Sequence, residues 1–247
     1  MKRFALLSLA ALATLALTSC EDDNNDAGKS KVQLVVKSST TLPNTGTAMR
    51  SMVGEGIVIE NFWVNIGEIE FDLTDEWEDK LNDSIVDAQE LDGPFLVNLM
   101  SQEALNGLSL GTTLIPNAAY EEVEFEFDRC LDASNQSMYN RSIYITGTIA
   151  DTPFVLWYND EVEFEISLEN STSFALTGET MKLYIDFNIA QIVSSLTAMN
   201  FSSATDGNGD GVIEIGPNDA DGNGDLASRI IEALEESVEL DDNDLDD

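Results

Sequence analysis

The 247-residue chain has no histidine, only 11 lysine and arginine residues, and only two cysteines. Without histidine it cannot use imidazole metal ligands or a catalytic centre built on a Ser–His–Asp triad or a Cys–His pair. Against the few basic residues stand 47 aspartates and glutamates, which give a formal net charge of -36. An electrostatic field of that sign repels the phosphates of DNA and RNA, so the sequence excludes nucleic acid as a partner.

The chain does contain enough apolar material for a folded core. Hydrophobic residues make up 43% of it and include 11 Phe, 5 Tyr and 3 Trp. This composition rules out a wholly disordered acidic chain. The length fits a single domain, or one domain with a small addition.

Residues 1–19 have the organisation of a secretory signal peptide. Lys2 and Arg3 form a short basic region, and the apolar stretch Phe4 to Leu17 that follows is too short to span a bilayer comfortably. It ends in Leu17-Thr18-Ser19-Cys20, which resembles the lipobox of bacterial lipoproteins, where cleavage precedes the cysteine and its sulfur is diacylated. The resemblance implies that lipid on Cys20 anchors the protein to a membrane.

Residues 20–30 form the predicted tether between that anchor and the folded domain. The run Glu21-Asp22-Asp23-Asn24-Asn25-Asp26 resembles the acidic tether that sends Bacteroidota lipoproteins to the cell surface, although its composition alone equally allows a plain solvated linker. We therefore expect an outer-membrane protein that faces the cell exterior. With lipid on Cys20, Cys130 has no disulfide partner, and its place at a strand end is typical of a small buried hydrophobic residue.

Residues 31–188 alternate apolar and polar residues in short runs, the period typical of half-buried strands. The runs lie at residues 32–36, 57–71, 123–127, 143–149, 154–157, 162–168 and 183–187. Alternation that leaves one face exposed to solvent is typical of antiparallel sheet, and many short strands favour a β-sandwich. A break or bulge is expected near Gly67, within the longest run.

Two of these runs carry a row of acidic residues on their polar side. One row comprises Glu122, Glu124, Glu126 and Asp128, and the other comprises Glu161, Glu163, Glu165 and Glu169. Like charges that lie opposite each other lower the stability of a sheet unless salt or cations compensate. The favoured interpretation is a solvated face, and the alternative is a docking surface for calcium or for a basic partner.

Residues 189–240 change to a helical period. Ile189 to Leu196 predicts one helix and Leu226 to Val238 predicts another, with a segment rich in Asp, Asn and Gly between them. Residues 241–247 are predicted to be a disordered acidic tail. The expected fold class is therefore mainly β, an antiparallel β-sandwich with a small C-terminal helix–calcium loop–helix appendage.

The calcium prediction rests on the order of residues between these helices. Calcium takes about six to eight oxygen ligands, and short Asp and Asn side chains at alternate positions of a tight loop supply them. Asp206, Asn208 and Asp210 occupy the first, third and fifth positions. Gly211 at the sixth position permits the turn, and Val212 offers its carbonyl oxygen at the seventh. This half-loop resembles EF-hand and dockerin-type calcium loops.

The rest of the loop departs from that pattern. Its twelfth position holds Pro217, which has no side-chain oxygen, so another residue must close the coordination sphere. The candidates for closure are Glu214, Asn218 and Asp219.

A second and weaker loop can be counted from Asp221. Asn223 is then third, Asp225 fifth and Glu232 twelfth, but Leu226 occupies the glycine position. Glu232 fits equally well as a surface residue of the second helix. One structural calcium ion is expected, and a second only if this weaker loop closes.

Three motifs of the sheet region resemble a domain of unknown function found in Bacteroidota lipoproteins. They are Val64-Asn65-Ile66-Gly67-Glu68-Ile69-Glu70-Phe71, Gly93-Pro94-Phe95-Leu96-Val97-Asn98-Leu99 and Leu114-Ile115-Pro116-Asn117-Ala118-Ala119-Tyr120. The resemblance covers residues 31–188 and implies a β-sandwich on the cell surface, without a settled activity.

No set of residues points to catalysis, so the sequence favours a non-enzymatic surface lipoprotein whose sandwich binds a glycan or a protein. Trp63, Trp77 and Trp157 are candidates for stacking on sugar rings; the strand positions of Trp63 and Trp157 are more typical of a core, and Trp77 lies in an acidic surface segment. The alternatives are a fimbrial or structural accessory subunit and, third, a glycan-active hydrolase with paired carboxylates.

Overall fold

The computed structural model describes residues 28–39, 52–54, 56–80, 89–167, 174–178, 180–235 and 237–241. The predicted signal peptide, Cys20, the acidic run after it and residues 242–247 lie outside the described residues. Within the described ranges, no helix has the length and apolar character needed to cross a membrane.

The smaller of two sheets has four strands in the order β13-β11-β1-β5. Its members are β1 (Lys29–Ser39), β5 (Leu108–Pro116), β11 (Thr180–Asn188) and β13 (Val238–Asp241). β1 pairs antiparallel with β5 and parallel with β11, and β13 closes the far edge of β11 in antiparallel register. The first and last described strands therefore belong to one sheet.

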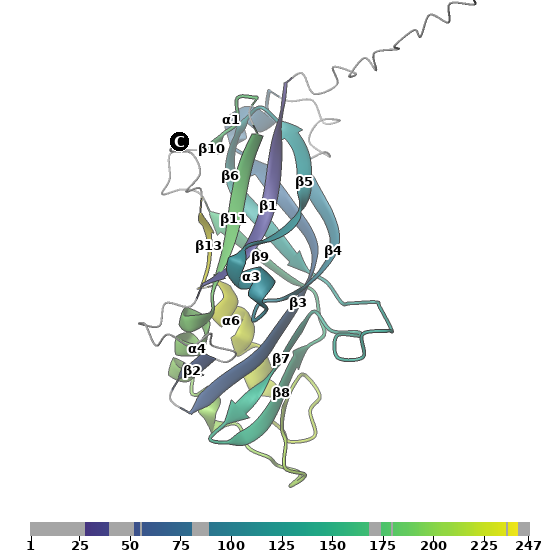
Figure 1. Ribbon diagram of the computed structural model, residues 1–247, viewed down its shortest axis with the longest axis vertical. Helices are drawn as coiled ribbons and strands as arrows, with labels where there is room; N and C mark the ends of the chain where they lie inside the picture. Colours follow the sequence, from purple (N-terminus) through teal and green to yellow (C-terminus); the bar gives the residue numbers. More distant parts are fainter. Residues whose placement is uncertain are drawn as a thin grey trace, which may run out of the picture.

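The larger sheet is organised around β3 (Ile57–Leu73), whose 17 residues run the length of the molecule (Figure 1). Along one edge β3 pairs first with β7 and then with β6, and along the other edge with β2 and β4. Its partners and their neighbours are β2 (Met52–Gly54), β4 (Glu90–Asn98), β6 (Ala119–Phe127), β7 (Ile143–Ile149), β8 (Thr152–Tyr158), β9 (Val162–Ser167), β10 (Phe174–Ala175) and β12 (Ile213–Ile215).

Apolar side chains from the inner faces of both sheets form one core. Leu34 and Ile185 of the small sheet and Phe62, Phe71 and Phe127 of the large sheet are at most 1% exposed and belong to the same cluster. Alternation along each strand places these residues inside and polar residues outside. The prediction of a mainly β fold with a sandwich architecture is confirmed.

Gly67 marks the bulge that the sequence predicted in β3. The pairing of β3 with both β4 and β6 shifts register between Ile66 and Glu68. A Cβ atom on Gly67 would lie 2.8 Å from Cβ and Oδ2 of Asp128, so the absence of a side chain lets the Asp128 carboxylate lie over β3. The bulge thereby brings the end of β6 close to the middle of β3.

Short helices occupy the ends and the C-terminal region. α1 (Asp75–Glu78), α3 (Gln102–Asn106) and the 3-10 helix η2 (Phe201–Ser203) are single turns, and α4 (Ile189–Ala198) confirms the predicted helix at residues 189–196. Cys130 is 4% exposed, as expected of a small buried residue.

The pairing differs from the all-antiparallel prediction at two places. β1 lies parallel to β11 and β12 lies parallel to β8. Alternating residues cannot distinguish parallel from antiparallel pairing, because a strand with one solvent-exposed face has a period of two in either case.

The C-terminal region differs more. The predicted helix from Leu226 to Val238 is two short helices, α5 (Gly224–Ala227) and α6 (Arg229–Glu235), and Val238 instead begins β13. The small C-terminal helix pair is as predicted, and two strands tie it to the sandwich, since β12 joins the large sheet and β13 the small one. Asp241, assigned to the tail, ends β13.

The N-terminal boundary is also earlier than predicted. β1 begins at Lys29, inside the segment 20–30 that was assigned to the tether. Lys29 and Ser30 pair with Pro116 and Ile115 of β5, and these long-range partners extend the strand.

Candidate metal sites and the outer sheet face

The predicted calcium segment lies between η2 and α5, at the end of the molecule beyond β7 and β8 (Figure 1). β12 lies within this segment and pairs with β8 through Ile213, Glu214 and Ile215. The segment is therefore attached to the large sheet and does not hang free.

Asp206 organises the first half of this loop. Its Oδ1 accepts hydrogen bonds from the N–H groups of Gly209 (2.7 Å) and Asp210 (3.1 Å), and its Oδ2 accepts one from Gly211 (2.8 Å). Gly209 and Gly211 have φ values of +79° and +93°, which L side chains rarely adopt. The glycines thus let the backbone wrap around one carboxylate.

The other two predicted side-chain ligands belong to the same wrapped turn. Asn208 Oδ1 accepts from the N–H of Asp210 at 2.8 Å, and Asp210 Oδ1 accepts from the N–H of Val212 at 2.9 Å. Asn208 and Asp210 are exposed. Three short oxygen-bearing side chains at alternate positions of a tight turn are the donor set that a hard cation such as calcium prefers, so these residues fit the predicted ion.

The side chain of Asp221, counted as the first position of the weaker loop, is hydrogen-bonded to the first loop. Its Oδ1 accepts from the N–H of Asn208 (3.0 Å) and its Oδ2 from the N–H of Glu214 (2.7 Å). These backbone hydrogen bonds, the one from Glu214 foremost, lower the pKa of Asp221 because they favour its charged form. Asp221 therefore bridges residues 208 and 214 as a carboxylate.

The buried side chain of Asn223 connects two parts of the same segment. It is 8% exposed, its Nδ2 donates to the carbonyl oxygens of Thr205 (2.9 Å) and Glu214 (2.8 Å), and its Oδ1 accepts from the N–H of Thr205. Asp219 in turn accepts from the N–H groups of Asn223 and Gly216. These bonds give Asn223 and Asp219 structural roles in the segment, and the ligand roles predicted for them stay predictions.

The remaining predicted ligands lie in or next to the helices and the strand of this segment. Asp225 is exposed at the start of α5, and Glu232 is exposed on α6. Glu214, within β12, and Val212, just before that strand, are half-buried. The structure therefore joins Asp206, Asn208, Asp210 and Asp221 by hydrogen bonds into one network around the first loop.

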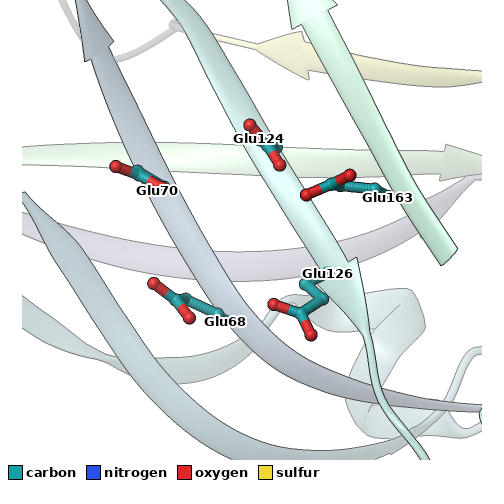
Figure 2. Close-up of a pocket in the computed structure, with 5 residues that line it drawn as sticks. All are labelled: Glu68, Glu70, Glu124, Glu126 and Glu163. Atoms are coloured by element: carbon teal, nitrogen blue, oxygen red, sulfur yellow. The ribbon is translucent and has the colours of Figure 1, made fainter. Parts of the chain in front are cut away.

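A second concentration of oxygen atoms covers the outer face of the large sheet. Glu126 pairs with Glu163 of β9 on one side and with Glu68 of β3 on the other, and Glu124 pairs in the same way with Glu165 and Glu70. Five of these side chains line a pocket of about 60 Å³, and Figure 2 shows them spread over β3, β6 and β9. The pocket is lined by Glu68, Glu70, Glu124, Glu126 and Glu163.

Crowding of like charges raises the pKa values on this face. The pKa of Glu124 is raised to about 7, first by a hydrogen bond with Glu163 and then by burial. Burial and then a hydrogen bond with Glu90 raise the pKa of Glu68 to about 7, and burial and then Glu165 do the same for Glu122. These carboxyl groups therefore ionise less readily than a free glutamate, because ionisation brings further like charges together in a partly buried cluster.

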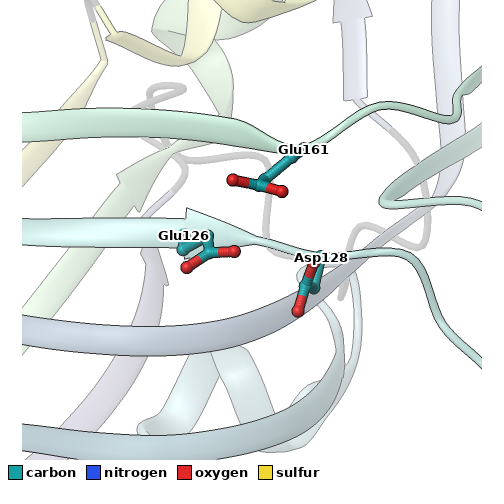
Figure 3. Close-up of side chains that lie close together, drawn as sticks. All are labelled: Glu126, Asp128 and Glu161. Carbon is teal, nitrogen blue, oxygen red and sulfur yellow. The ribbon is translucent and has the colours of Figure 1, made fainter.

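At one end of this face, three carboxylates lie close enough to hold a metal ion. One oxygen from each of Glu126, Asp128 and Glu161 lies within 4.8 Å of the others (Figure 3). The buried Asn65 supports the group, since its Nδ2 donates to the backbone oxygen of Asp128 at 3.0 Å. An all-oxygen set of this kind suits a hard divalent cation.

The sequence predicted the glutamate rows of β6 and β9 but not the row from β3. Glu68, Glu70 and Asp72 alternate in β3 just as clearly, and this pattern was the available signal. Only the register of β3 with β6 shows that the rows share one face.

Aromatic residues occupy the outer face further along β3. Trp63 pairs with Tyr144 of β7, and Tyr144 pairs with Trp157 of β8, so the three form one row. All three are half-buried and belong neither to the core cluster nor to the residues packed against it. The sequence left both a core position and a stacking role open for Trp63 and Trp157. They lie on this outer face because the buried Phe62 and Val64 take the inner positions of β3 and the buried Leu156 that of β8. Trp77, predicted to be exposed, packs against the core.

Neither a family model nor a curated protein matches the chain. Two solved structures are similar to it. MbnP from Methylosinus trichosporium has 9% sequence identity and a TM-score of 0.33 over 68% of this chain and 78% of that one. A candidate cell adhesion protein from Bacteroides fragilis NCTC 9343 has 15% identity and a TM-score of 0.22 over 66% of this chain and 42% of that one. Both TM-scores are too low for either likeness to carry an argument about function.

Proposed function

We propose that the chain is a non-catalytic, lipid-anchored surface protein of the outer membrane whose sandwich binds a glycan or a protein, and that the loop at residues 206–212 holds calcium as a structural ion. The observation that carries the calcium proposal is the wrapping of three backbone N–H groups around the Asp206 carboxylate, with Asn208 and Asp210 at alternate positions beside it.

A cation bound in this loop would stabilise the fold in two ways. It would neutralise the repulsion between Asp206 and Asp210, which lie in a protein of net charge -36. It would also hold the loop closed immediately before β12, which adds to the large sheet beside β8. Binding only to the folded state then raises stability, by about 2.7 kcal/mol when free calcium is about 100 times Kd.

The test compares thermal unfolding of the chain from residue 21 onward in millimolar calcium and in chelator. We expect calcium to raise Tm for the wild type and to leave Tm unchanged for the double variant Asp206→Asn/Asp210→Asn. The matched control is Glu60→Gln/Glu103→Gln, which removes two exposed carboxylates elsewhere and should keep the full calcium effect. Coincident melting curves for the wild type in the two buffers would refute the calcium proposal.

The anchor has its own test, because Cys20 lies outside the described residues. The full chain is produced in a bacterium that processes lipoproteins and is labelled with a radioactive fatty acid. We expect label in the outer-membrane fraction for the wild type and none for Cys20→Ser. Sensitivity to protease added to intact cells tests the orientation, and resistance would place the domain on the inner side of the membrane.

A further inference from the structure

The aromatic row lies across three neighbouring strands in matched register. Trp63 of β3, Tyr144 of β7 and Trp157 of β8 are direct cross-strand partners. Neighbouring strands are about 4.8 Å apart, so the two tryptophans are separated by roughly 10 Å of sheet. That separation is comparable to the length of a disaccharide.

Each of these rings keeps part of its surface exposed and lies outside the core cluster. Each is half-buried on the outer face, whereas the inner positions of the same strands, Val64, Ile143 and Leu156, are buried. Large aromatic residues are usually placed inside, where they bury most area. Three of them in one outward row indicate a use other than folding.

Neutral hydrogen-bonding groups border the row. Asn61 lies two residues before Trp63 on the same face, and its Nδ2 donates to Oγ1 of Thr146 at 3.0 Å. Asn98 pairs with Trp63 from β4, and its Nδ2 reaches Oδ1 of Asn61 at 3.4 Å. Amide and hydroxyl groups donate and accept, so they match the hydroxyls of a sugar as the ring faces match its C–H groups.

Two further residues hold the rings in place. The guanidinium of Arg141 lies 5.1 Å from the centre of the Tyr144 ring and 5.6 Å from that of Trp157, and it donates to the carbonyl oxygen of Ser137. Gly216 lies against the indole of Trp157. Rings fixed before binding lose less entropy when a ligand arrives.

We propose that this aromatic row, formed by Trp63, Tyr144 and Trp157, binds a neutral glycan chain by stacking of its sugar rings. The net charge of -36 disfavours acidic polysaccharides. This proposal rests on the proposed function in one respect, since both take the sandwich to be the part of the protein that binds a ligand.

The test is affinity electrophoresis of the chain from residue 21 onward, in calcium, through gels that contain starch, galactomannan, mannan or alginate. We expect at least one neutral polysaccharide to retard the wild type and the acidic alginate not to do so. Trp63→Ala and Trp157→Ala should each weaken binding about tenfold. Trp77→Ala is the matched control and should leave retardation unchanged. Trp157→Phe, which keeps an aromatic face, should retain most of the binding.

Folding is checked separately from binding. Each variant should keep the wild-type circular dichroism spectrum, so that lost retardation reports on the rings. Absence of retardation of the wild type in all the neutral gels would overturn the glycan proposal, and so would equal retardation of the Trp63→Ala, Trp157→Ala and Trp77→Ala variants. A normal calcium-dependent Tm in the same samples would show that the calcium proposal survives that failure.

Discussion

Gly216 lies so close to Trp157 that a Cβ atom built on the glycine would be 2.1 Å from Cε2 of the indole. The N–H of Gly216 also donates to Oδ2 of Asp219 at 3.3 Å, within the C-terminal loop. The loop that carries the candidate calcium ligands therefore also backs the outermost ring of the aromatic row.

Gly216→Ala is expected to displace the indole and to lower stability by roughly 1–3 kcal/mol, since an added methyl group in a packed contact forces its neighbours to move. Urea unfolding measures the change. A double-mutant cycle supplies the control, because Gly216→Ala should cost much less in a Trp157→Ala background. Equal costs in both backgrounds would mean that the ring is not the obstacle.

Asn223→Ala is expected to lower the free energy of unfolding by roughly 1–3 kcal/mol, because it removes a buried side chain that donates to the carbonyl oxygens of Thr205 and Glu214. Denaturant unfolding in chelator gives the value without any contribution from calcium. The exposed Asn218→Ala is the matched control and should change it by less than about 0.5 kcal/mol. Similar effects of the two substitutions would contradict the role assigned to Asn223.

Stability in chelator is expected to fall as pH rises from about 5 to about 8. The pKa values of Glu68, Glu122 and Glu124 are raised from 4.5 to about 7, so between those values the folded state binds more protons than the unfolded state. Proton release on raising the pH then favours unfolding. Thermal melts across this pH window test the sign, and a Tm that rises with pH would contradict it.

Glu124→Gln should stabilise the protein at pH 8 by up to about 1 kcal/mol, because it removes one of two like charges that meet across β6 and β9. The amide can still donate a hydrogen bond to Glu163. The exposed Glu121→Gln, on the same strand, serves as the control and should have a smaller effect. Destabilisation by Glu124→Gln would show that the carboxylate is needed on this face.

The two candidate metal positions should be separable by calcium titration calorimetry. Asp206→Asn/Asp210→Asn is expected to remove binding at the loop, and Asp128→Asn/Glu161→Gln should remove any binding at the cluster in Figure 3. The two pairs lie on different elements, so their effects should add. An isotherm unchanged by Asp128→Asn/Glu161→Gln would leave the loop as the only calcium site among these residues.

Local patterns account for what the sequence predicted correctly. The strands at residues 143–149, the helix beginning at Ile189, the bulge near Gly67 and the burial of Cys130 each depend on periodicity or on one residue type within a short stretch. The order Asp206, Asn208 and Asp210 likewise fixed the turn, because short side chains and glycines act on their own backbone.

The sequence by itself thus determined a strongly acidic, histidine-free β protein with an Asp- and Asn-rich turn near its C-terminus. Only the tertiary structure decided that β13 closes the small sheet, that Glu68 faces Glu126, and that Trp63, Tyr144 and Trp157 form one outward row. Strand partners and register depend on contacts between residues far apart in the chain, and a shift of one residue turns every side chain to the other face. Periodicity within a strand carries no information about that choice.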